Sequence, residues 1–268
     1  MSRIAFLGAG NLASAMVDGL LAQGTVAKSD LVCFSVSGRT AAALAARTGI
    51  AHAPTLEALL DGADLLVVAF KPQHLAGADP RLAALTAGRL VISVLAGKRL
   101  ATLARVFPQA RNLVRTMPNT PAAIGAAITP YCTLHPLSDA DRAAVESLLG
   151  ACGQHLAIGE EHMNAVTALS GSGPAFFFEF VAALRDAGIA ANLPPEVSTR
   201  LSVETMLGAA RLLAHRGGDA ETLRNQVTSP NGTTFAGLKK LAAANFRGTI
   251  RDTILAAQAR AAELSKDD

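Results

Sequence analysis

The feature that most constrains the fold of this chain is a change of hydrophobic pattern near residue 160. Before that point, short and nearly continuous apolar runs occupy residues 3–7, 31–35, 65–70 and 90–95. Such runs are typical of strands that are buried on both faces of a parallel sheet. Segments with helical spacing lie between and after them, at residues 11–23, 40–48, 55–61 and 99–106. The alternation predicts βαβ units in a doubly wound sheet with right-handed crossovers.

The remainder of the chain completes this division into two halves. Weaker strand candidates at residues 112–115, 126–132 and 155–158 extend the sheet. Beyond them only helical spacing is found, at residues 161–184, 195–214, 220–228 and 234–264. We therefore predict an α/β fold, in which a doubly wound, Rossmann-like N-terminal domain of residues 1–159 precedes an all-helical C-terminal domain of residues 160–268.

Composition narrows the classes of protein to which the chain could belong. The longest charge-free apolar runs fall well short of the roughly 18 to 20 residues of a membrane span. Gly8 interrupts the N-terminal apolar run too early for the apolar core of a signal peptide. We therefore expect a cytoplasmic protein without membrane contact. The net charge of +3 is spread along the chain, with one Tyr and no Trp, which argues against a nucleic-acid partner. Three cysteines without paired spacing predict neither disulfides nor a metal site.

A glycine-rich turn predicts a dinucleotide site. Gly8, Ala9, Gly10, Asn11, Leu12 and Ala13 follow the first apolar run and open the first helical segment. In this context Gly8 makes a tight turn, Gly10 lets a pyrophosphate approach the backbone, and the helix N-terminus offers N–H groups to the phosphates. The alternative interpretation is a purely structural turn between strand and helix.

The end of the second predicted strand indicates which dinucleotide is bound. An NAD site usually carries an acidic residue there, whereas this chain has Ser37, Arg39 and Thr40, which suit a 2′-phosphate. We therefore expect NADPH as the cofactor, with NADH as a second donor, unless Arg39 is only a solvated helix residue.

The loops after the third and fourth strands should border the same ligand, because ligands of open α/β sheets lie at the carboxyl ends of the strands. These loops hold Ala69, Phe70, Lys71, Pro72, Ala96 and Gly97.

Two features of the helical half indicate a subunit interface and a substrate site. Residues 175–184 are apolar nearly all round, which predicts that a partner subunit covers them unless they form a plain core helix. Residues 229–234 join small residues, a proline and hydroxyls to the start of an amphipathic helix. Such a loop is suited to cradle a carboxylate, and the alternative is an ordinary N-cap at Thr233.

Several long motifs occur together, at residues 115–121, 170–176 and 227–234, with the glycine-rich turn and residues 70–73. In this order, from residue 4 to about 264, the chain resembles the pyrroline-5-carboxylate reductase family. The resemblance implies NADPH-dependent hydride transfer to the C=N carbon of 1-pyrroline-5-carboxylate, which gives L-proline as the last step of proline biosynthesis. It also implies dimerisation through the helical domain, with a higher oligomer of dimers left open.

The resemblance assigns roles to particular residues. Thr234 is the expected catalytic residue, which bonds or relays a proton to the imine nitrogen. The expected substrate-binding residues are Ser229, Asn231, Gly232, Thr233, Thr234, Ser170, Gly171 and Ser172. The expected cofactor-binding residues are Leu7, Gly8, Ala9, Gly10, Asn11, Leu12, Ser37, Arg39, Thr40, Thr55, Ala69, Phe70, Lys71, Pro72, Ala96, Gly97 and Asn119.

The chain departs from the family pattern at several positions. Phe70 stands where the family often has Val, and Phe176 stands where it has Tyr. Thr55 stands where many members have an Asn on the adenine side. Asn192 and Asn231 stand in place of glycines. Asn231 lies in the substrate loop. Because Asn is the non-glycine residue that most readily adopts positive φ, we expect the loop geometry to be kept.

Three other functions compete with this prediction. The substrate could be a related cyclic imine acid. A β-hydroxyacid dehydrogenase would share the nucleotide domain, but residues 170–173 are followed by Pro174 and phenylalanines, with no lysine placed to act as acid or base. A non-catalytic NADP-binding protein would keep the glycine-rich turn and would have no use for residues 229–234.

Overall fold

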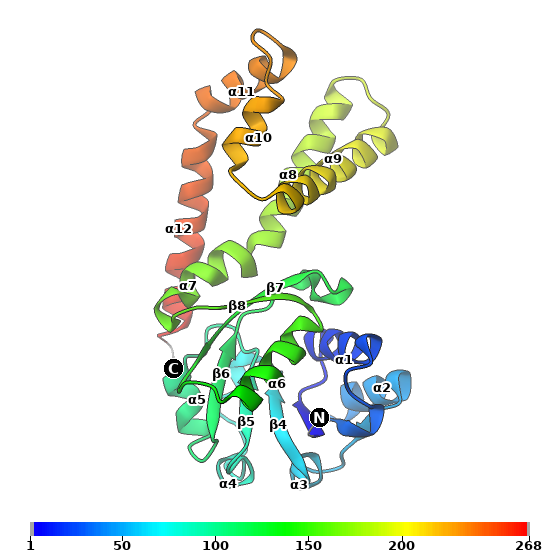
Figure 1. Cartoon of the computed structure of the whole chain (residues 1–268), viewed down its shortest axis with the longest axis vertical. Coiled ribbons are helices and arrows are strands. Elements are labelled where there is room, and N and C mark those ends of the chain that lie inside the picture. The colour runs from blue at the N-terminus through cyan, green and yellow to red at the C-terminus, as the bar shows by residue number, and fades with distance from the viewer. Residues whose placement is uncertain (1–2, 267–268) are drawn as a thin grey trace. The chain divides into compact units, whose positions relative to one another are not determined.

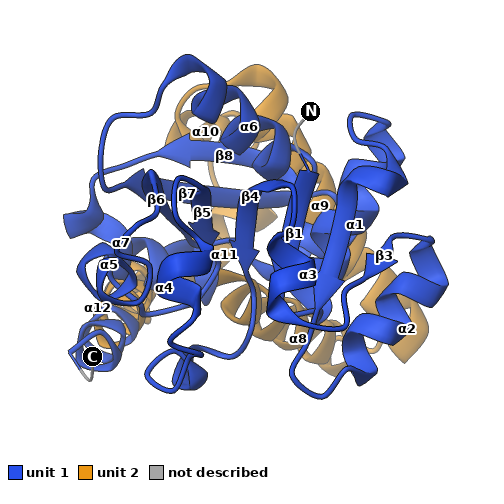
Figure 2. Ribbon diagram, turned by 90° about the horizontal axis from the view of Figure 1, so that it is seen from below, with its two compact units in different colours: residues 1–172, 257–268 blue, residues 173–256 orange. Residues whose placement is uncertain are grey.

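The computed structural model describes residues 3–266, and its atoms cluster in two compact units, which are described separately below. Unit 1 comprises the residues up to 172 together with those from 257 onward, and unit 2 comprises residues 173–256 (Figures 1 and 2). The predicted domain boundary at residue 160 therefore differs from the division between the units. Residues 160–172 and the end of the last helix both pack with unit 1.

Unit 1 is built on an eight-stranded sheet with the order β3-β2-β1-β4-β5-β6-β7-β8. The strands are β1 (Arg3–Leu7), β2 (Leu31–Phe34), β3 (Ala51–His52), β4 (Ala63–Val68), β5 (Leu90–Ser93), β6 (Asn112–Thr116), β7 (Ala127–Thr133) and β8 (Gly153–Ala157). Neighbouring strands are parallel except for β6 and β7, which run antiparallel with Arg115 opposite Cys132. The predicted doubly wound sheet is confirmed, and the reversed strand is an addition that the apolar pattern did not reveal.

Helices cover both faces of this sheet (Figure 2). They are α1 (Asn11–Gln23), α2 (Arg39–Thr48), α3 (Leu56–Leu60), α4 (Leu82–Leu85), α5 (Leu100–Val106), α6 (Asp139–Gly150) and α7 (Met163–Val166). Alternate residues of one strand enter opposite cores, as Phe6 packs with α1, α2 and α6 while Leu7 packs with α3, α4 and α5. Both faces of the sheet are therefore buried, which explains the nearly continuous apolar runs of the strands.

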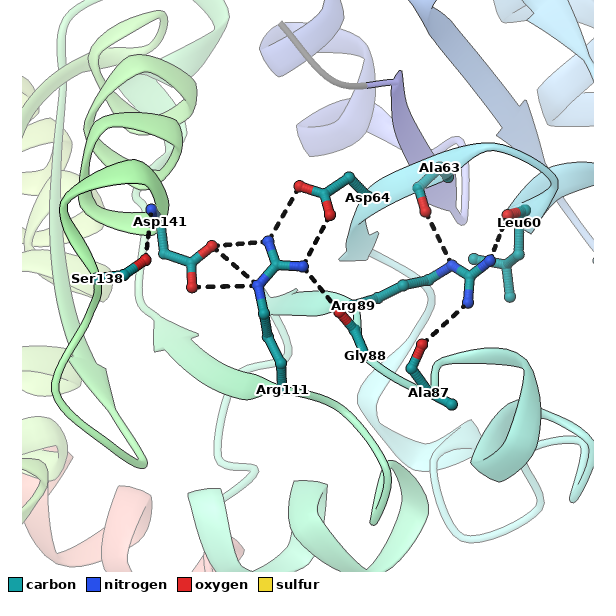
Figure 3. Close-up of polar contacts among 9 residues, drawn as sticks. All are labelled: Leu60, Ala63, Asp64, Ala87, Gly88, Arg89, Arg111, Ser138 and Asp141. Atoms are coloured by element: carbon teal, nitrogen blue, oxygen red, sulfur yellow. Dashed lines mark hydrogen bonds and ion pairs between the residues drawn. The ribbon is translucent and has the colours of Figure 1, made fainter.

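Arginines hold the amino-terminal edge of the sheet together. The Arg111 guanidinium bridges the carboxylates of Asp64 and Asp141 at 2.8 and 2.7 Å and also donates to the carbonyl oxygen of Gly88 (Figure 3). Arg89 donates to the carbonyl oxygens of Leu60 and Ala63. Because these contacts lie where β4, β5 and β6 begin, the opposite edge, where the strands end, is left for ligands.

Unit 2 is helical throughout. It contains α8 (Gly173–Ala190), α9 (Pro195–Arg216), α10 (Ala220–Gln226), α11 (Thr233–Ala243) and the first part of α12 (Phe246–Leu264). The helical spacing predicted at residues 234–264 is divided between two helices, because Asn245 adopts a left-handed backbone with φ of 51° and separates α11 from α12. Helix α8 follows α7 through a π-helical turn, Thr167–Gly171.

One segment, Glu160–Ala190, is long and apolar enough by length and composition to cross a membrane, and only 6% of its most apolar window is buried. The expectation from the sequence concerned a different quantity, the length of charge-free apolar runs. It counted strictly apolar runs, whereas Ser, Thr and Gly also extend this helical stretch without adding charge. Length and composition are weak criteria, since a helix that packs against another subunit meets them equally well.

Candidate functional site

The turn after β1 requires glycine at its first position. Gly8 has φ of 107°, and a Cβ added there would collide with the backbone of Ala69 and Phe70. The Gly8 N–H donates to the carbonyl oxygen of Phe34 at 2.8 Å, which joins the end of β1 to the end of β2. The predicted tight turn at Gly8 is therefore confirmed, and its cause is the close approach of the chain that leaves β4.

The start of α1 suits a phosphate group. Gly10 is the N-cap with no side-chain hydrogen bond, the first turn contains no acidic residue, and a Cβ on Gly10 would have no neighbour within 4 Å. Ala13 is fully buried, so α1 packs closely on the sheet. Unpaired N–H groups and the positive end of the helix dipole therefore face open space beside Gly10. The residues fit the diphosphate of a dinucleotide.

The turn after β2 exposes the residues predicted to select the cofactor. Ser35 shapes this turn, because its carbonyl oxygen accepts from the Gly38 N–H and its hydroxyl accepts from the Ala41 N–H. Arg39 starts α2, is exposed, and makes no hydrogen bond or ion pair with any residue in the described range 3–266. An exposed and unpaired guanidinium is available for a 2′-phosphate.

Other predicted cofactor residues occupy the neighbouring loops at the same edge. Exposed Lys71 precedes a short 3₁₀ helix after β4, and exposed Ala96 with Gly97 (φ of 78°) follows β5. Thr55 instead caps α3, where its hydroxyl accepts from the Ala58 N–H at 3.2 Å. Because β1, β4 and β5 are adjacent, their carboxyl ends bring these loops together.

Two of the sequence motifs meet within unit 1. The Asn119 side chain accepts from the Ile128 N–H and donates to the Ser170 carbonyl oxygen, both at 3.2 Å. A Cβ on Gly171 would approach the end of the Met117 side chain to 2.5 Å. The π-helical turn that carries Ser170 and Gly171 is closed by the Ser172 N–H and the Thr167 carbonyl oxygen at 2.8 Å. Such turns are frequent at functional sites. Asn119, predicted to bind the cofactor, thus joins strand β7 to the π-helical turn.

The loop before α11 leaves a helix N-terminus uncapped in unit 2. Gly232, rather than Thr233, is the N-cap, and no side chain accepts from the first turn, which contains no acidic residue. The Asn231 backbone is left-handed with φ of 57°, and the Gly232 N–H donates to the Ser229 carbonyl oxygen at 3.1 Å. The hydroxyl of Thr234 is exposed and makes no hydrogen bond within residues 3–266. The exposed N–H groups can hold a carboxylate.

Both asparagines that replace family glycines adopt positive φ, 68° at Asn192 and 57° at Asn231. The prediction that Asn231 keeps the glycine geometry is therefore confirmed. The physical reason is that the short polar side chain of Asn tolerates the left-handed region at low cost.

The cysteines take no part in this site. Cys33, Cys132 and Cys152 are free and buried, and burial raises the pKa of each thiol to about 11. Within residues 3–266, no group of three or more His, Cys, Asp or Glu side chains is arranged to hold a metal ion.

One contact near the site was not predicted from the sequence. The Glu160 carboxylate accepts from the Leu100 N–H at 2.7 Å and pairs with the Arg115 guanidinium at 3.0 Å. The partners lie 60 and 45 positions away along the chain, so no local pattern could have indicated this contact.

Two protein-family models match the chain. Residues 160–264 match "Pyrroline-5-carboxylate reductase dimerisation", and residues 3–97 match "NADP oxidoreductase coenzyme F420-dependent". The first match begins at Glu160 and covers the segment that is long enough to span a membrane. The exposed apolar residues of that segment are thereby accounted for as part of a dimerisation region.

Whole proteins and solved structures agree with these matches. The chain is 36% identical to the pyrroline-5-carboxylate reductase of Arabidopsis thaliana over 266 residues, which cover 98% of this chain and 96% of that protein. It is similar to the pyrroline-5-carboxylate reductase structure from Coxiella burnetii, with 31% identity, a TM-score of 0.93 and 98% coverage of both chains. The Plasmodium falciparum structure with NADP bound has 26% identity, a TM-score of 0.86 and the same coverage.

Proposed function

The chain belongs to the pyrroline-5-carboxylate reductase family, and on that premise we propose that it reduces 1-pyrroline-5-carboxylate to L-proline with NADPH. The observation on this chain that carries the proposal is the uncapped start of α11 behind the left-handed Asn231. An anionic substrate needs such a group of N–H donors, whereas a protein that only bound a nucleotide would not.

NADPH, when bound, supplies the hydride. Its diphosphate would lie against the N-terminus of α1 at Gly10, and Arg39 with Ser37 and Thr40 would hold the 2′-phosphate. The NADP found in the Plasmodium falciparum relative supports this assignment. The other residues that we propose to contact the cofactor are Leu7, Ala9, Asn11, Leu12, Thr55, Ala69, Phe70, Lys71, Pro72, Ala96, Gly97 and Asn119.

The substrate would be held by its carboxylate. The backbone N–H groups at the start of α11 serve as donors, with Ser229, Asn231, Gly232 and Thr233 forming the loop around them. Ser170, Gly171 and Ser172 are further proposed substrate-binding residues. Fixing the carboxylate orients the ring, and orientation of this kind is a main contribution of the protein when a cofactor carries the reaction.

Thr234 is the proposed catalytic residue. Its exposed hydroxyl is free to donate to, or relay a proton to, the imine nitrogen of the substrate. A protonated imine is already electrophilic, so a single hydroxyl is enough and no strong general acid is needed. This agrees with the residue types at the start of α11, which include no His, Lys, Asp or Glu in the first turn.

We further propose that the protein works in the cytoplasm as a homodimer formed through its helical region. The match of residues 160–264 to a dimerisation family supports the dimer. Exposed phenylalanines on α8, with Phe178 at 67% exposure, support it as well, because water-exposed aromatic side chains of this kind are normally covered by a partner.

The test is a turnover assay with the purified protein. NADPH and 1-pyrroline-5-carboxylate are mixed with the enzyme, the nicotinamide absorbance is followed, and proline is identified as the product. Related cyclic imine acids and NADH are assayed in parallel. Oxidation of NADPH that yields proline supports the proposal, and faster turnover of a different ring imine would replace the substrate.

A further inference from the structure

We propose that Glu160 is a positioning residue that holds two cofactor-edge loops in place, the loop of Ala96 and Gly97 and the segment that leads to Asn119. The proposal rests on the proposed function for the identity of the ligand. A single carboxylate oxygen, Oε1 of Glu160, accepts from both the Leu100 N–H at 2.7 Å and the Arg115 Nη1 at 3.0 Å. One atom thus joins the start of α5 to the end of β6.

Glu160 replaces the cap that α5 lacks. The N-cap residue of α5, Arg99, makes no side-chain capping bond, and the first turn contains no acidic residue. The Glu160 carboxylate therefore satisfies a helix N–H and places a negative charge at the positive end of the helix dipole. Because α5 directly follows Ala96 and Gly97, fixing its first turn also fixes the end of that loop.

The second contact anchors β6. The Arg115 side chain is only 4% exposed, and Glu160 is its ion-pair partner among residues 3–266. A nearly buried guanidinium needs such a partner, because an unpaired buried charge is costly. Next to it, the Thr116 hydroxyl donates to the Ser93 carbonyl oxygen at 3.0 Å, which ties the ends of β6 and β5 together. After β6 ends at Thr116, the chain continues through Met117 to Asn119.

The loop after β5 also contacts the end of the chain. Arg99 Nη2 donates to the buried hydroxyl of Ser265 at 3.3 Å, and the backbone of Leu264 lies beside Gly97. The loop is thus held by Glu160 at α5 and by the end of α12 at Arg99. Loss of the Glu160 charge weakens the support at α5 and removes the ion pair with Arg115, so we expect the loop to be less firmly positioned.

The experiment compares Glu160→Gln with Glu161→Gln. The first substitution removes the charge while keeping an oxygen that can accept from Leu100, and the second removes the same charge from a side chain that is 72% exposed. We measure the dissociation constant of NADPH by titration calorimetry and the melting temperature of each protein. Glu160→Gln should weaken NADPH binding about tenfold, and Glu161→Gln should leave it unchanged.

A double-variant cycle tests whether Glu160 acts through Arg115. If both side chains belong to one unit, Arg115→Gln combined with Glu160→Gln should bind NADPH within about twofold of Glu160→Gln alone. Fully additive losses would overturn the proposal. So would a Glu160→Gln protein that melts earlier yet binds NADPH like the wild type, because that result describes a stabilising contact only.

Glu160→Asp covers the case in which the Gln variant does not fold. It keeps the charge near Arg115 but shortens the side chain by one methylene, so one carboxylate oxygen cannot serve both partners. NADPH binding should again weaken about tenfold.

Failure of the proposed function is distinguishable from failure of this inference. A wild type that binds NADPH without reducing 1-pyrroline-5-carboxylate would refute the function, whereas the ratio of dissociation constants tests Glu160 alone.

Discussion

The two units of this chain bury their apolar residues in opposite ways. In unit 1, each face of the sheet carries its own dry core, in which Phe6, Leu66 and Phe107 are almost completely buried. In unit 2, no apolar side chain between residues 173 and 256 is buried, and its buried side chains are those of Ser198 and Ser202. Unit 1 thus has a core of its own, whereas unit 2 leaves its apolar side chains uncovered, as the proposed dimer requires.

Small residues explain how unit 2 holds together without a core of its own. A Cβ on Gly188 in α8 would collide with the Ser198 hydroxyl in α9, and that hydroxyl donates to the Arg185 carbonyl oxygen at 2.7 Å. The two helices therefore approach closely through Gly and Ser, and their large apolar residues point elsewhere. Apolar side chains can therefore stabilise either a single subunit or an assembly, depending on where small residues let the helices approach each other.

The largest expected effect follows from breaking the interface. Phe177→Asp places a charge on an exposed face of α8 that a partner subunit should cover, so the dimer should dissociate or the helical unit unfold. Sedimentation velocity at micromolar concentration measures the assembly. Val36→Asp, at a position of unit 1 that is 97% exposed, is the control and should sediment like the wild type. A wild type that is already monomeric at this concentration would contradict the interpretation of unit 2.

A smaller effect is expected at the uncapped start of α11. Thr234→Ala should lower turnover by about ten- to a hundredfold with unaltered NADPH affinity, since the hydroxyl interacts more strongly as charge changes during hydride transfer. Because Gly232 is the cap, the substitution should cost little stability. Steady-state kinetics with cofactor titration provides the measurement. Thr199→Ala, which removes an exposed hydroxyl that bonds within α9, is the matched control. Unchanged turnover of Thr234→Ala would leave Thr234 a purely structural residue.

In unit 1, a single substitution should change the cofactor preference without changing the fold. The wild type should prefer NADPH, and Arg39→Asp should reverse the preference, because a carboxylate repels the 2′-phosphate and bonds the free 2′-hydroxyl. The ratio of kcat/KM for the two cofactors measures it. Arg105→Asp makes the same charge change near the end of α5 and should keep the wild-type ratio. Equal efficiency of the wild type with both cofactors would remove the basis for this prediction.

The smallest effect concerns alkaline pH and again separates the two units, because all three cysteines lie in unit 1. Burial raises the pKa of the Cys152 thiol from its ordinary 9.0 to about 11. Between these values the unfolded chain loses a proton that the folded protein keeps, so the free energy of unfolding falls as pH rises through this window. Urea unfolding at pH 8 and pH 10 should show a loss of about 1.3 kcal/mol for each thiol. Cys152→Ala should lose less than the wild type, and an equal loss would contradict the shift.

Much of the secondary structure could be predicted because it follows from local pattern. The expected strands at residues 3–7, 65–70 and 90–95 correspond to β1, β4 and β5, and the helix at residues 11–23 is α1. Helix α6 was not predicted, although Val145, Leu148 and Leu149 form its buried apolar face, and neither was the two-residue strand β3. A strand as short as β3 depends on its neighbours for stability, so its sequence carries little signal.

The positions that require a particular backbone conformation could also be predicted from the sequence, because that requirement is local. Gly8 and Asn231 stand where the chain must adopt positive φ, and few residue types tolerate that conformation. The alternative interpretation placed the cap of α11 at Thr233, whereas the cap is Gly232, because both residue types are acceptable caps and only the turn geometry selects between them.

By itself, the sequence determined the alternation of strands and helices, the glycine-rich turn, the family motifs and the apolar helical half, all of which depend on residues close together in the chain. Only the tertiary structure decided that β7 runs antiparallel to β6, that Asn119 joins Ile128 to Ser170, and that Glu160 links Leu100 to Arg115. These contacts join polar groups that are distant in sequence, and one hydrogen bond to a backbone amide leaves no periodic trace in the sequence of either partner.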